Sequence, residues 1–393
     1  MYDTFCMILI VSYICTMIED INPFPSSVYK GPDYFCNRVA ETKQINQLIK
    51  NGVHIALFAI RRLGKTGLIH HVFHTHKNNS KMVCIYVDIL ATKDLSEFTN
   101  MIATAVYNRF PPQKNLGKKI AELFKRFRPT ITFDELSGTP SLSLTIDTKT
   151  QKESTIGQIF HFLDKQNIKV VFAIDEFQQI LEYPETNTEA ILRTQIQQLK
   201  NTSFIFCGSN QKMMHQIFNS AKRPFFASCT NLNLGYIEQI DYQLFIKKKL
   251  QEHRRKIDAE ALDFICRWTG LHTFYTQHFC FTLFTKNKVN TTLVEVHETA
   301  IDILKLNEST FFQYKNLLTT AQWNLLRAIA NEEKVYQPQS KFFIGKYFLG
   351  TPALVKRGLD ALLEKEMIFY QSGVEKPYYE VYDKFLMRWL QHK

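Results

Sequence analysis

The chain has 393 residues, of which 45% are hydrophobic and 22% are charged. This composition excludes wholesale disorder, and the length indicates two or three domains. The formal net charge is +11, which favours anionic partners such as a nucleotide, a nucleic acid or an acidic protein surface. Because the basic excess is spread along the chain, the sequence contains no dedicated basic DNA-binding tail.

The N-terminal segment carries one apolar stretch, Cys6 to Ile18. It is shorter than the roughly 20 apolar residues that span a bilayer, and it lacks the basic region and cleavage site of a secretory signal. Met17 offers an alternative start, so we expect residues 1–16 to be an upstream extension or a small docking strand, and no membrane anchor. Residues 1–34 together are predicted to form an extension and lead-in. None of the eight cysteines forms a CxxC pair, which favours a reducing, cytoplasmic location.

Short apolar runs alternate with amphipathic segments between residues 35 and 235. The runs predict strands buried on both faces, and the amphipathic segments predict helices. We expect strands at 53–58, 82–90, 169–174 and 203–207, and helices from Gly67 onward and at 95–110, 156–167 and 189–199. This alternation is typical of a parallel sheet sandwiched by helices. An insert near 130–146 alternates with period two around a turn, which predicts a hairpin.

Basic residues are most concentrated between Arg109 and Arg128, where seven of them meet a single acid, Glu122. A solvated helix face explains this run better than a surface that follows a phosphate backbone. We therefore assign the run no ligand.

After residue 236 the strand pattern fades. Three amphipathic segments, at 242–256, 259–269 and 274–285, predict helices, and residues 236–312 are assigned to a helical lid.

The C-terminal residues 313–393 show the order of a winged-helix domain, with helices followed by two short strands. The predicted elements are helices at 320–330 and 352–364 and strands at 367–370 and 378–382. Lys356 and Arg357 lie on the last of these helices and would suit DNA phosphates. Three nearby acids argue against a strong nucleic-acid surface; they are Asp360, Glu364 and Glu366.

A phosphate-binding loop is predicted directly after the first strand. Its residues are Ala59, Ile60, Arg61, Arg62, Leu63, Gly64, Lys65, Thr66 and Gly67. A strand, a loop and a helix N-terminus in this order direct backbone N–H groups and the positive end of the helix dipole at an anion. Lys65 would reach the β- and γ-phosphates, and the Thr66 hydroxyl would bind Mg²⁺. Ala59 stands where such a motif normally begins with glycine.

An acidic pair, Asp175 and Glu176, follows the third apolar strand. On a neighbouring parallel strand, Asp175 would lie beside the metal held by Thr66, and Glu176 would polarise the attacking water. An ordinary acidic turn is the alternative, but the combination with the loop favours a nucleotide site. Ser209 and Asn210 end the next strand, where they would orient water near the γ-phosphate, cap a helix, or do both.

These motifs resemble those of the AAA+-related ATPases of the STAND type, in the archaeal-type branch. Arg61 to Thr66 is similar to the family's RR-x-GKT loop, and Asp175 to Gln178 resembles its DEFQ motif. Tyr34 to Arg38 resembles an aromatic motif whose arginine lies against the adenine. Lys222 to Phe226 is similar to a KRPFY segment, and His272 to Gln277 falls where the family has a lid signature.

The resemblance extends over almost the whole chain after residue 20. Other members carry a further arginine near the position of Ser228, and its absence here leaves Arg223 as the basic candidate for a catalytic role. The resemblance also implies that Arg38 contacts the nucleotide.

The sequence therefore predicts an α/β fold, in which a P-loop NTPase core with a parallel sheet (35–235) precedes a helical lid (236–312) and a C-terminal winged-helix domain (313–393). We expect the protein to bind ATP or ADP with Mg²⁺ and to act as a slow ATPase that switches conformation with its nucleotide. Two alternatives stay open: a nucleotide-gated DNA-binding protein and an ATP-binding scaffold without hydrolysis. The protein partner, an oligomer in the ATP state and the choice between ATP and GTP also stay open.

Overall fold

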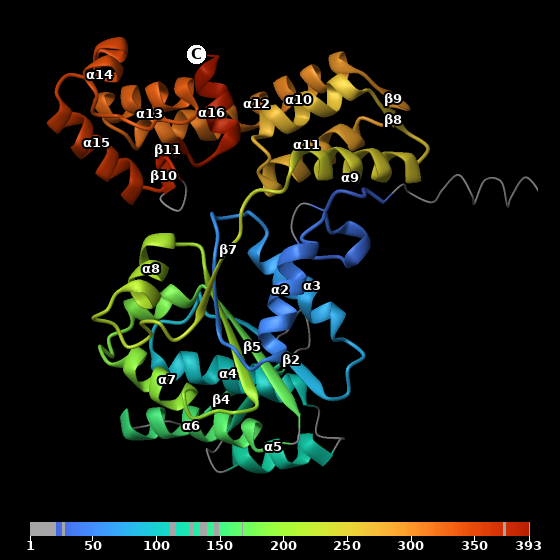
Figure 1. Cartoon of the computed structure of the whole chain (residues 1–393), viewed down its shortest axis with the longest axis vertical. Helices are drawn as coiled ribbons and strands as arrows, with labels where there is room; N and C mark the ends of the chain where they lie inside the picture. The colour runs from blue at the N-terminus through green and yellow to red at the C-terminus, as the bar shows by residue number, and fades with distance from the viewer. Residues whose placement is uncertain are drawn as a thin grey trace, which may run out of the picture. The chain divides into compact units, whose positions relative to one another are not determined.

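The computed structural model describes residues 21–25, 28–110, 115–125, 129–133, 140–144, 149–166, 168–371 and 375–392. The chain divides into two compact units, Tyr29–Tyr236 and Ile237–Lys393, and the described residues before Tyr29 belong to the second (Figure 1). We call these the α/β unit and the helical unit.

The α/β unit alternates strands and helices. In chain order its elements are η1 (Pro32–Tyr34), α2 (Val39–Lys50), β1 (Ile55–Phe58), α3 (Lys65–Thr75), β2 (Met82–Asp88), α4 (Leu95–Arg109), α5 (Asn115–Lys125), β3 (Thr130–Phe133), β4 (Pro140–Ser143), α6 (Lys149–Asp164), β5 (Lys169–Asp175), η2 (Phe177–Glu182), α7 (Thr188–Ile196), β6 (Thr202–Gly208), α8 (Gln211–Asn219) and β7 (Thr230–Asn233). The η elements are short 3₁₀ helices.

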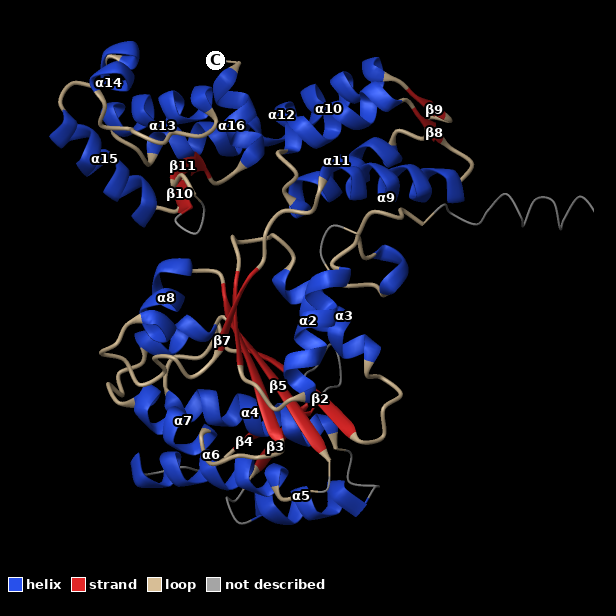
Figure 2. Ribbon diagram, in the orientation of Figure 1, coloured by secondary structure: helices blue, strands red, loops and turns tan. Residues whose placement is uncertain are grey.

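A five-stranded parallel sheet with the order β2-β5-β6-β1-β7 forms the centre of this unit. Figure 2 shows α2 and α3 on one face of the sheet and α7 and α8 on the other. The apolar runs of β1, β5 and β6 are almost entirely buried, as is typical of central strands in a parallel sheet. The predicted α/β class with a parallel sheet is therefore confirmed.

Some elements differ from the sequence prediction. The edge strand β7 was missed because its sequence, Thr-Asn-Leu-Asn, has only one buried residue, Leu232. Helix α6 begins at Lys149, earlier than the predicted residue 156, because its first turns are polar and show no apolar period. In the insert, β3 and β4 pair antiparallel, whereas most of the predicted turn lies outside the described residues.

The helical unit contains the remaining elements. They are α9 (Gln239–Glu252), β8 (Lys256–Ile257), α10 (Ala259–Thr269), α11 (Thr273–Thr285), β9 (Asn290–Thr291), α12 (Leu293–Asn316), α13 (Thr320–Glu332), α14 (Lys341–Tyr347), α15 (Pro352–Glu364), β10 (Ile368–Gln371), β11 (Tyr378–Val381) and α16 (Lys384–Gln391). Helix α12 starts at a capping box formed by Thr292 and Glu295 and continues across residue 312, where we placed the end of the lid.

The last helix, α16, joins the two halves of the helical unit. The Arg388 guanidinium donates hydrogen bonds of 2.8 Å to the carbonyl oxygens of Arg267 and Trp268, which end helix α10. The Arg267 carbonyl also accepts from the Gly270 backbone N–H at 3.2 Å, and both carbonyls lie in the last turn of α10, where a cation complements the helix dipole. The Phe385 ring also packs 5.4 Å from Trp268. The α10–α12 helices and the C-terminal domain are thus held together as one body.

The N-terminal residues are anchored to both units in turn. Phe24 is buried in the helical unit, with its ring 6.3 Å from Phe245 and 6.4 Å from Phe284. The Tyr29 hydroxyl hydrogen-bonds His71 of α3 in the α/β unit at 2.9 Å. Among the described residues, no helix is both long and apolar enough to span a membrane.

Candidate functional site

The predicted phosphate-binding loop connects the end of β1 to the start of α3. Gly64 precedes the helix with φ of 99°, a conformation that glycine adopts without steric cost. Arg62 is also left-handed, with φ of 61°, whereas Ala59, Ile60 and Leu63 are buried. Backbone N–H groups at the start of α3 therefore face the space at the carboxyl end of the sheet, where an anion is favoured.

Helix α3 begins with the three residues expected to hold the nucleotide. Lys65 is its first residue and is almost completely buried, with 6% of its surface exposed. Thr66 and Gly67 follow in the same turn. A Cβ atom added at Gly67 would lie 3.5 Å from the Phe35 ring, which is an ordinary contact, so packing there does not require glycine.

The Asp175 carboxylate lies at the end of β5 and meets this helix. Its Oδ2 atom accepts hydrogen bonds from the Thr66 hydroxyl at 2.6 Å and from the Tyr86 hydroxyl at 2.9 Å. Its Oδ1 atom accepts from the Cys207 thiol at 3.1 Å and from the backbone N–H of Glu176 at 3.0 Å. The prediction that the Asp175 strand would be the neighbour of the loop's strand is wrong, because β6 lies between β1 and β5. Thr66 on α3 nevertheless reaches Asp175, since all these parallel strands end at the same edge of the sheet.

Electrostatics keep this carboxylate charged. Burial by itself would raise the pKa of Asp175, but the hydrogen bond from Thr66, the positive charge of Lys65 and the bonds from Cys207 and Tyr86 together lower it below its usual range. Hydroxyl and carboxylate oxygens are the ligands that Mg²⁺ prefers. The Thr66 and Asp175 oxygens, already in contact, fit such an ion.

Glu176 is the next residue and turns sharply away from the strand, with φ of 54°. Its Oε2 atom accepts hydrogen bonds from the Ser209 hydroxyl at 2.7 Å, the Ser209 backbone N–H at 3.1 Å and the Gln178 side-chain amide at 2.5 Å. The structure thus brings together Glu176 and Ser209, two of the residues predicted to act on water.

The other predicted site residues have different surroundings. The Asn210 side chain accepts from the backbone N–H of Met213 at 3.1 Å and so caps α8. Arg223 forms a 2.7 Å ion pair with the buried Glu189 of α7. Arg38 is buried at the start of α2, where it pairs with Glu41 at 2.8 Å and donates to the Leu63 carbonyl at 3.4 Å. Arg38 is therefore tied to the loop.

The contacts that several polar residues make with Asp175 and Glu176 were not predicted. Tyr86, Cys207 and Gln178 donate to the two carboxylates, as described above. Asp88 of β2 lies opposite Asp175 in the sheet register. Burial and the neighbouring carboxylates raise the pKa of Asp88, and the Leu90 backbone N–H opposes this effect. Tyr86 and Asp88 could have been suspected from their position at the carboxyl end of β2, the strand that pairs with β5.

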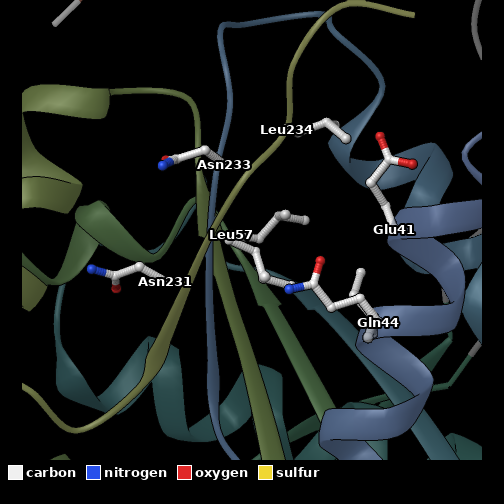
Figure 3. A pocket seen from close by; sticks show the side chains of 8 residues that line it. Glu41, Gln44, Leu57, Asn231, Asn233 and Leu234 are labelled. Atoms are coloured by element: carbon white, nitrogen blue, oxygen red, sulfur yellow. The ribbon is translucent and has the colours of Figure 1, made fainter. Parts of the chain in front are cut away.

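A separate pocket of about 220 Å³ lies between α2 and the edge of the sheet. Figure 3 shows Glu41 and Gln44 projecting from α2 toward the strands, with Asn231 and Asn233 of β7 pointing to the opposite side. Its remaining lining is apolar and comes from Ile45, Leu57, Leu232 and Leu234. Glu41 connects this pocket to the loop through its ion pair with Arg38.

Comparisons with known proteins agree with this arrangement. The family model "ATPase domain predominantly from Archaea" matches residues 35–270, and the model "Probable winged helix domain" matches residues 309–392. No curated protein matches the chain.

Two solved structures show the same fold over nearly their full length. The Walker-type ATPase of Pyrococcus abyssi is 13% identical with a TM-score of 0.62, and the alignment covers 94% of this chain and 99% of that one. The ORC2 protein of Aeropyrum pernix, solved as ADPNP–ADP complexes, is 11% identical with a TM-score of 0.56, covering 95% and 97%. The first family model spans more than half of the chain, and the chain therefore belongs to the family of ATPase domains found predominantly in Archaea.

Proposed function

We propose that the protein is a Mg²⁺-dependent ATPase of the STAND type, which hydrolyses ATP slowly and changes conformation with its bound nucleotide. The observation that carries the proposal is the 2.6 Å hydrogen bond between Thr66 and Asp175. It joins the first turn of the helix after a phosphate-binding loop to a carboxylate at the end of β5, which β6 separates from the strand before the loop. Oxygen donors in this arrangement suit a metal that bridges nucleotide phosphates.

Each side chain has a distinct task in this proposal. Lys65 and the N-terminus of α3 bind the β- and γ-phosphates, while Thr66 and Asp175 hold Mg²⁺, which would neutralise charge on the phosphate oxygens. Glu176 orients a water molecule toward the γ-phosphate and accepts its proton. Ser209 holds the Glu176 carboxylate in place through two hydrogen bonds.

Replacement of the metal-binding carboxylate should affect binding itself. We expect Asp175→Asn to weaken Mg²⁺-dependent ATP binding by about tenfold or more, because one charged ligand is lost. Titration of ATP by calorimetry at several Mg²⁺ concentrations measures this effect. Asp164→Asn is the matched control, because Asp164 caps backbone N–H groups at the opposite end of β6. Equal Mg²⁺ dependence in Asp175→Asn and the wild type would remove Asp175 from the metal site.

The conformational part of the proposal rests on the construction of the helical unit. Since Arg388 and Phe385 hold α10 against the C-terminal domain, a nucleotide that moves the α9–α12 helices would carry that domain with them. A ligand shifts such an equilibrium only through its different affinity for the two states.

Hydrogen exchange in ATP and in ADP tests this coupling. We expect protection to change together in α10–α11 and in α13–α16 when ATP replaces ADP. In Arg388→Ala the change should remain in α10–α11 but shrink in α13–α16, whereas Lys356→Ala, at an exposed lysine of the same domain, should behave as the wild type. Identical exchange in both nucleotides across residues 237–392 would refute the conformational switch.

The two alternative functions have less support. Lys356 and Arg357 are exposed on α15, but so are Asp360 and Glu364 on the same helix and Glu366 just after it. This mixture of charges does not favour a DNA surface. A DNA mobility shift with strong salt dependence would support the nucleotide-gated DNA-binding function. An absence of turnover together with tight ATP binding would support a scaffold.

A further inference from the structure

The Glu176 carboxylate is held through only one of its two oxygens. The side-chain amide nitrogen of Gln178 donates a hydrogen bond of 2.5 Å to the Oε2 atom of Glu176. The same atom accepts from the hydroxyl and the backbone N–H of Ser209. In the part of the chain that the structure describes, no donor bonds the Oε1 atom of Glu176. Three donors thus fix the carboxylate, and its Oε1 atom keeps its lone pairs.

The Gln178 amide makes this contact at a cost to its own oxygen. Gln178 is 7% exposed, and only its nitrogen can face Glu176, because an amide oxygen there would meet a second acceptor. The amide oxygen is then buried without a hydrogen-bond partner among the residues described. Almost all buried polar atoms in proteins are hydrogen-bonded, so an exception marks a side chain whose position serves another demand. Here that demand is the contact with Glu176.

Space for the amide depends on Gly208, the last residue of β6. A Cβ atom added there would lie 1.9 Å from the amide oxygen of Gln178 and 2.8 Å from the Met214 sulfur. The backbone of Gly208 does not have a positive φ, so its conformation does not require glycine, but the space does. The end of β6 therefore provides both the room for Gln178 and, through the following Ser209, the other two donors.

The short helix η2 that carries Gln178 is fixed in the core of the α/β unit. Its first residue, Phe177, is fully buried, with its ring 4.5 Å from Phe206 and 5.5 Å from Phe225. A donor on such a rigid support holds its acceptor more closely than one on a mobile loop. The Gln178 amide is therefore pre-organised to orient Glu176.

We propose that Gln178 is a positioning residue for ATP hydrolysis, which directs the Oε1 atom of Glu176 at the attacking water. The inference rests on the proposed function, in which Glu176 accepts a proton from that water. Because the three donors bond Oε2, they oppose rotation of the carboxylate, and Oε1 is the atom left to take the proton. Close positioning matters here, since a small misplacement of a reacting group lowers a rate strongly.

Gln178→Met tests the role of the amide. Methionine has a similar length but no donor, and it also removes the unpartnered oxygen. Single-turnover hydrolysis should slow by about tenfold or more, whereas ATP affinity should stay at the wild-type value. Thermal unfolding should occur at the wild-type temperature or above it, because no buried polar atom loses its last partner. A merely structural role would instead lower the unfolding temperature.

The control for this variant is Gln179→Met. Gln179 is the next residue, and its side-chain amide donates to the Thr92 carbonyl at 3.1 Å, away from Glu176. We expect this variant to hydrolyse ATP at the wild-type rate.

A second pair of variants leaves Gln178 in place. Gly208→Ala should displace its amide and slow hydrolysis on the order of tenfold, with unchanged ATP affinity. Gly157→Ala is the matched control, because its added Cβ atom would lie 2.4 Å from the amide oxygen of Gln195. It displaces a glutamine amide between α6 and α7, which is not a donor to Glu176, and hydrolysis should stay at the wild-type rate.

The outcomes separate this inference from the proposed function. Wild-type rates in both Gln178→Met and Gly208→Ala, beside an inactive Glu176→Gln, would overturn the positioning role and leave the ATPase function intact. Faster hydrolysis in Gln178→Met would also overturn it, because the amide would then restrain the base. A wild type without turnover would overturn the ATPase function, and this inference with it.

Discussion

Lys65→Ala is expected to weaken ATP binding on the order of a hundredfold or more. Lys65 is a buried cation at the first position of α3, where it would bond the β- and γ-phosphates. A hydrogen bond to a charged group contributes about 1.5–3 kcal/mol, which corresponds to about 10- to 150-fold in affinity for a single bond. Calorimetric titration with ATP and Mg²⁺ measures the loss.

The control for this variant is Lys77→Ala. Lys77 is exposed just beyond the end of α3, so its removal takes away one positive charge near the same helix without changing the loop. Circular dichroism and thermal unfolding should show that both variants fold. Wild-type ATP affinity in a folded Lys65→Ala protein would contradict the phosphate-binding role of the loop.

Glu176→Gln is expected to stop hydrolysis while leaving ATP binding near the wild-type value. The amide oxygen of glutamine can still accept the hydrogen bonds that Ser209 now donates to Glu176, but the amide cannot take a proton from water. A positioned general base contributes about 10²- to 10⁴-fold to the rate. Single-turnover hydrolysis with enzyme in excess detects a loss of this size even when the wild type is slow.

Glu182→Gln provides the matched control, because Glu182 is an exposed residue at the end of the short helix that follows Glu176. We expect it to hydrolyse ATP at the wild-type rate. Equal slow rates in Glu176→Gln and the wild type would mean that this carboxylate takes no part in catalysis. Together with intact binding, that result would favour the scaffold function.

The central sheet could be predicted from the sequence because the burial of each strand leaves a pattern within that strand's own residues. Strands β1, β5 and β6 are buried on both faces and so appear as apolar runs. Parallel strands place their carboxyl ends at one edge, which allowed the meeting of Thr66 with Asp175 to be anticipated. The interaction of Glu176 with Ser209 follows from the same rule, since β5 and β6 are neighbours.

What the sequence did not predict depends on contacts between distant segments. Tyr86 and Cys207 became recognisable as partners of Asp175 only once the strand order was known, because nothing in their own segments marks them as polar contacts of a carboxylate. Arg223 and Glu189 form an ion pair although they are distant in the sequence. A contact between two such side chains leaves no periodic pattern in the sequence, so it could not be predicted. β7 lacked an apolar run because an edge strand is covered on fewer sides.

The double anchoring of the N-terminal residues restricts the kind of motion that is open to the protein. Phe24 is held in the helical unit and Tyr29 in the α/β unit, and the intervening chain spans at most about 18 Å when fully extended. The second covalent link runs from Leu234, whose N–H donates to the Phe58 carbonyl at 2.8 Å, to the start of α9 at Gln239, and it is equally short. Two links of this length limit how far the helical unit can separate from the α/β unit, and covalent connectivity sets that limit whichever nucleotide is bound.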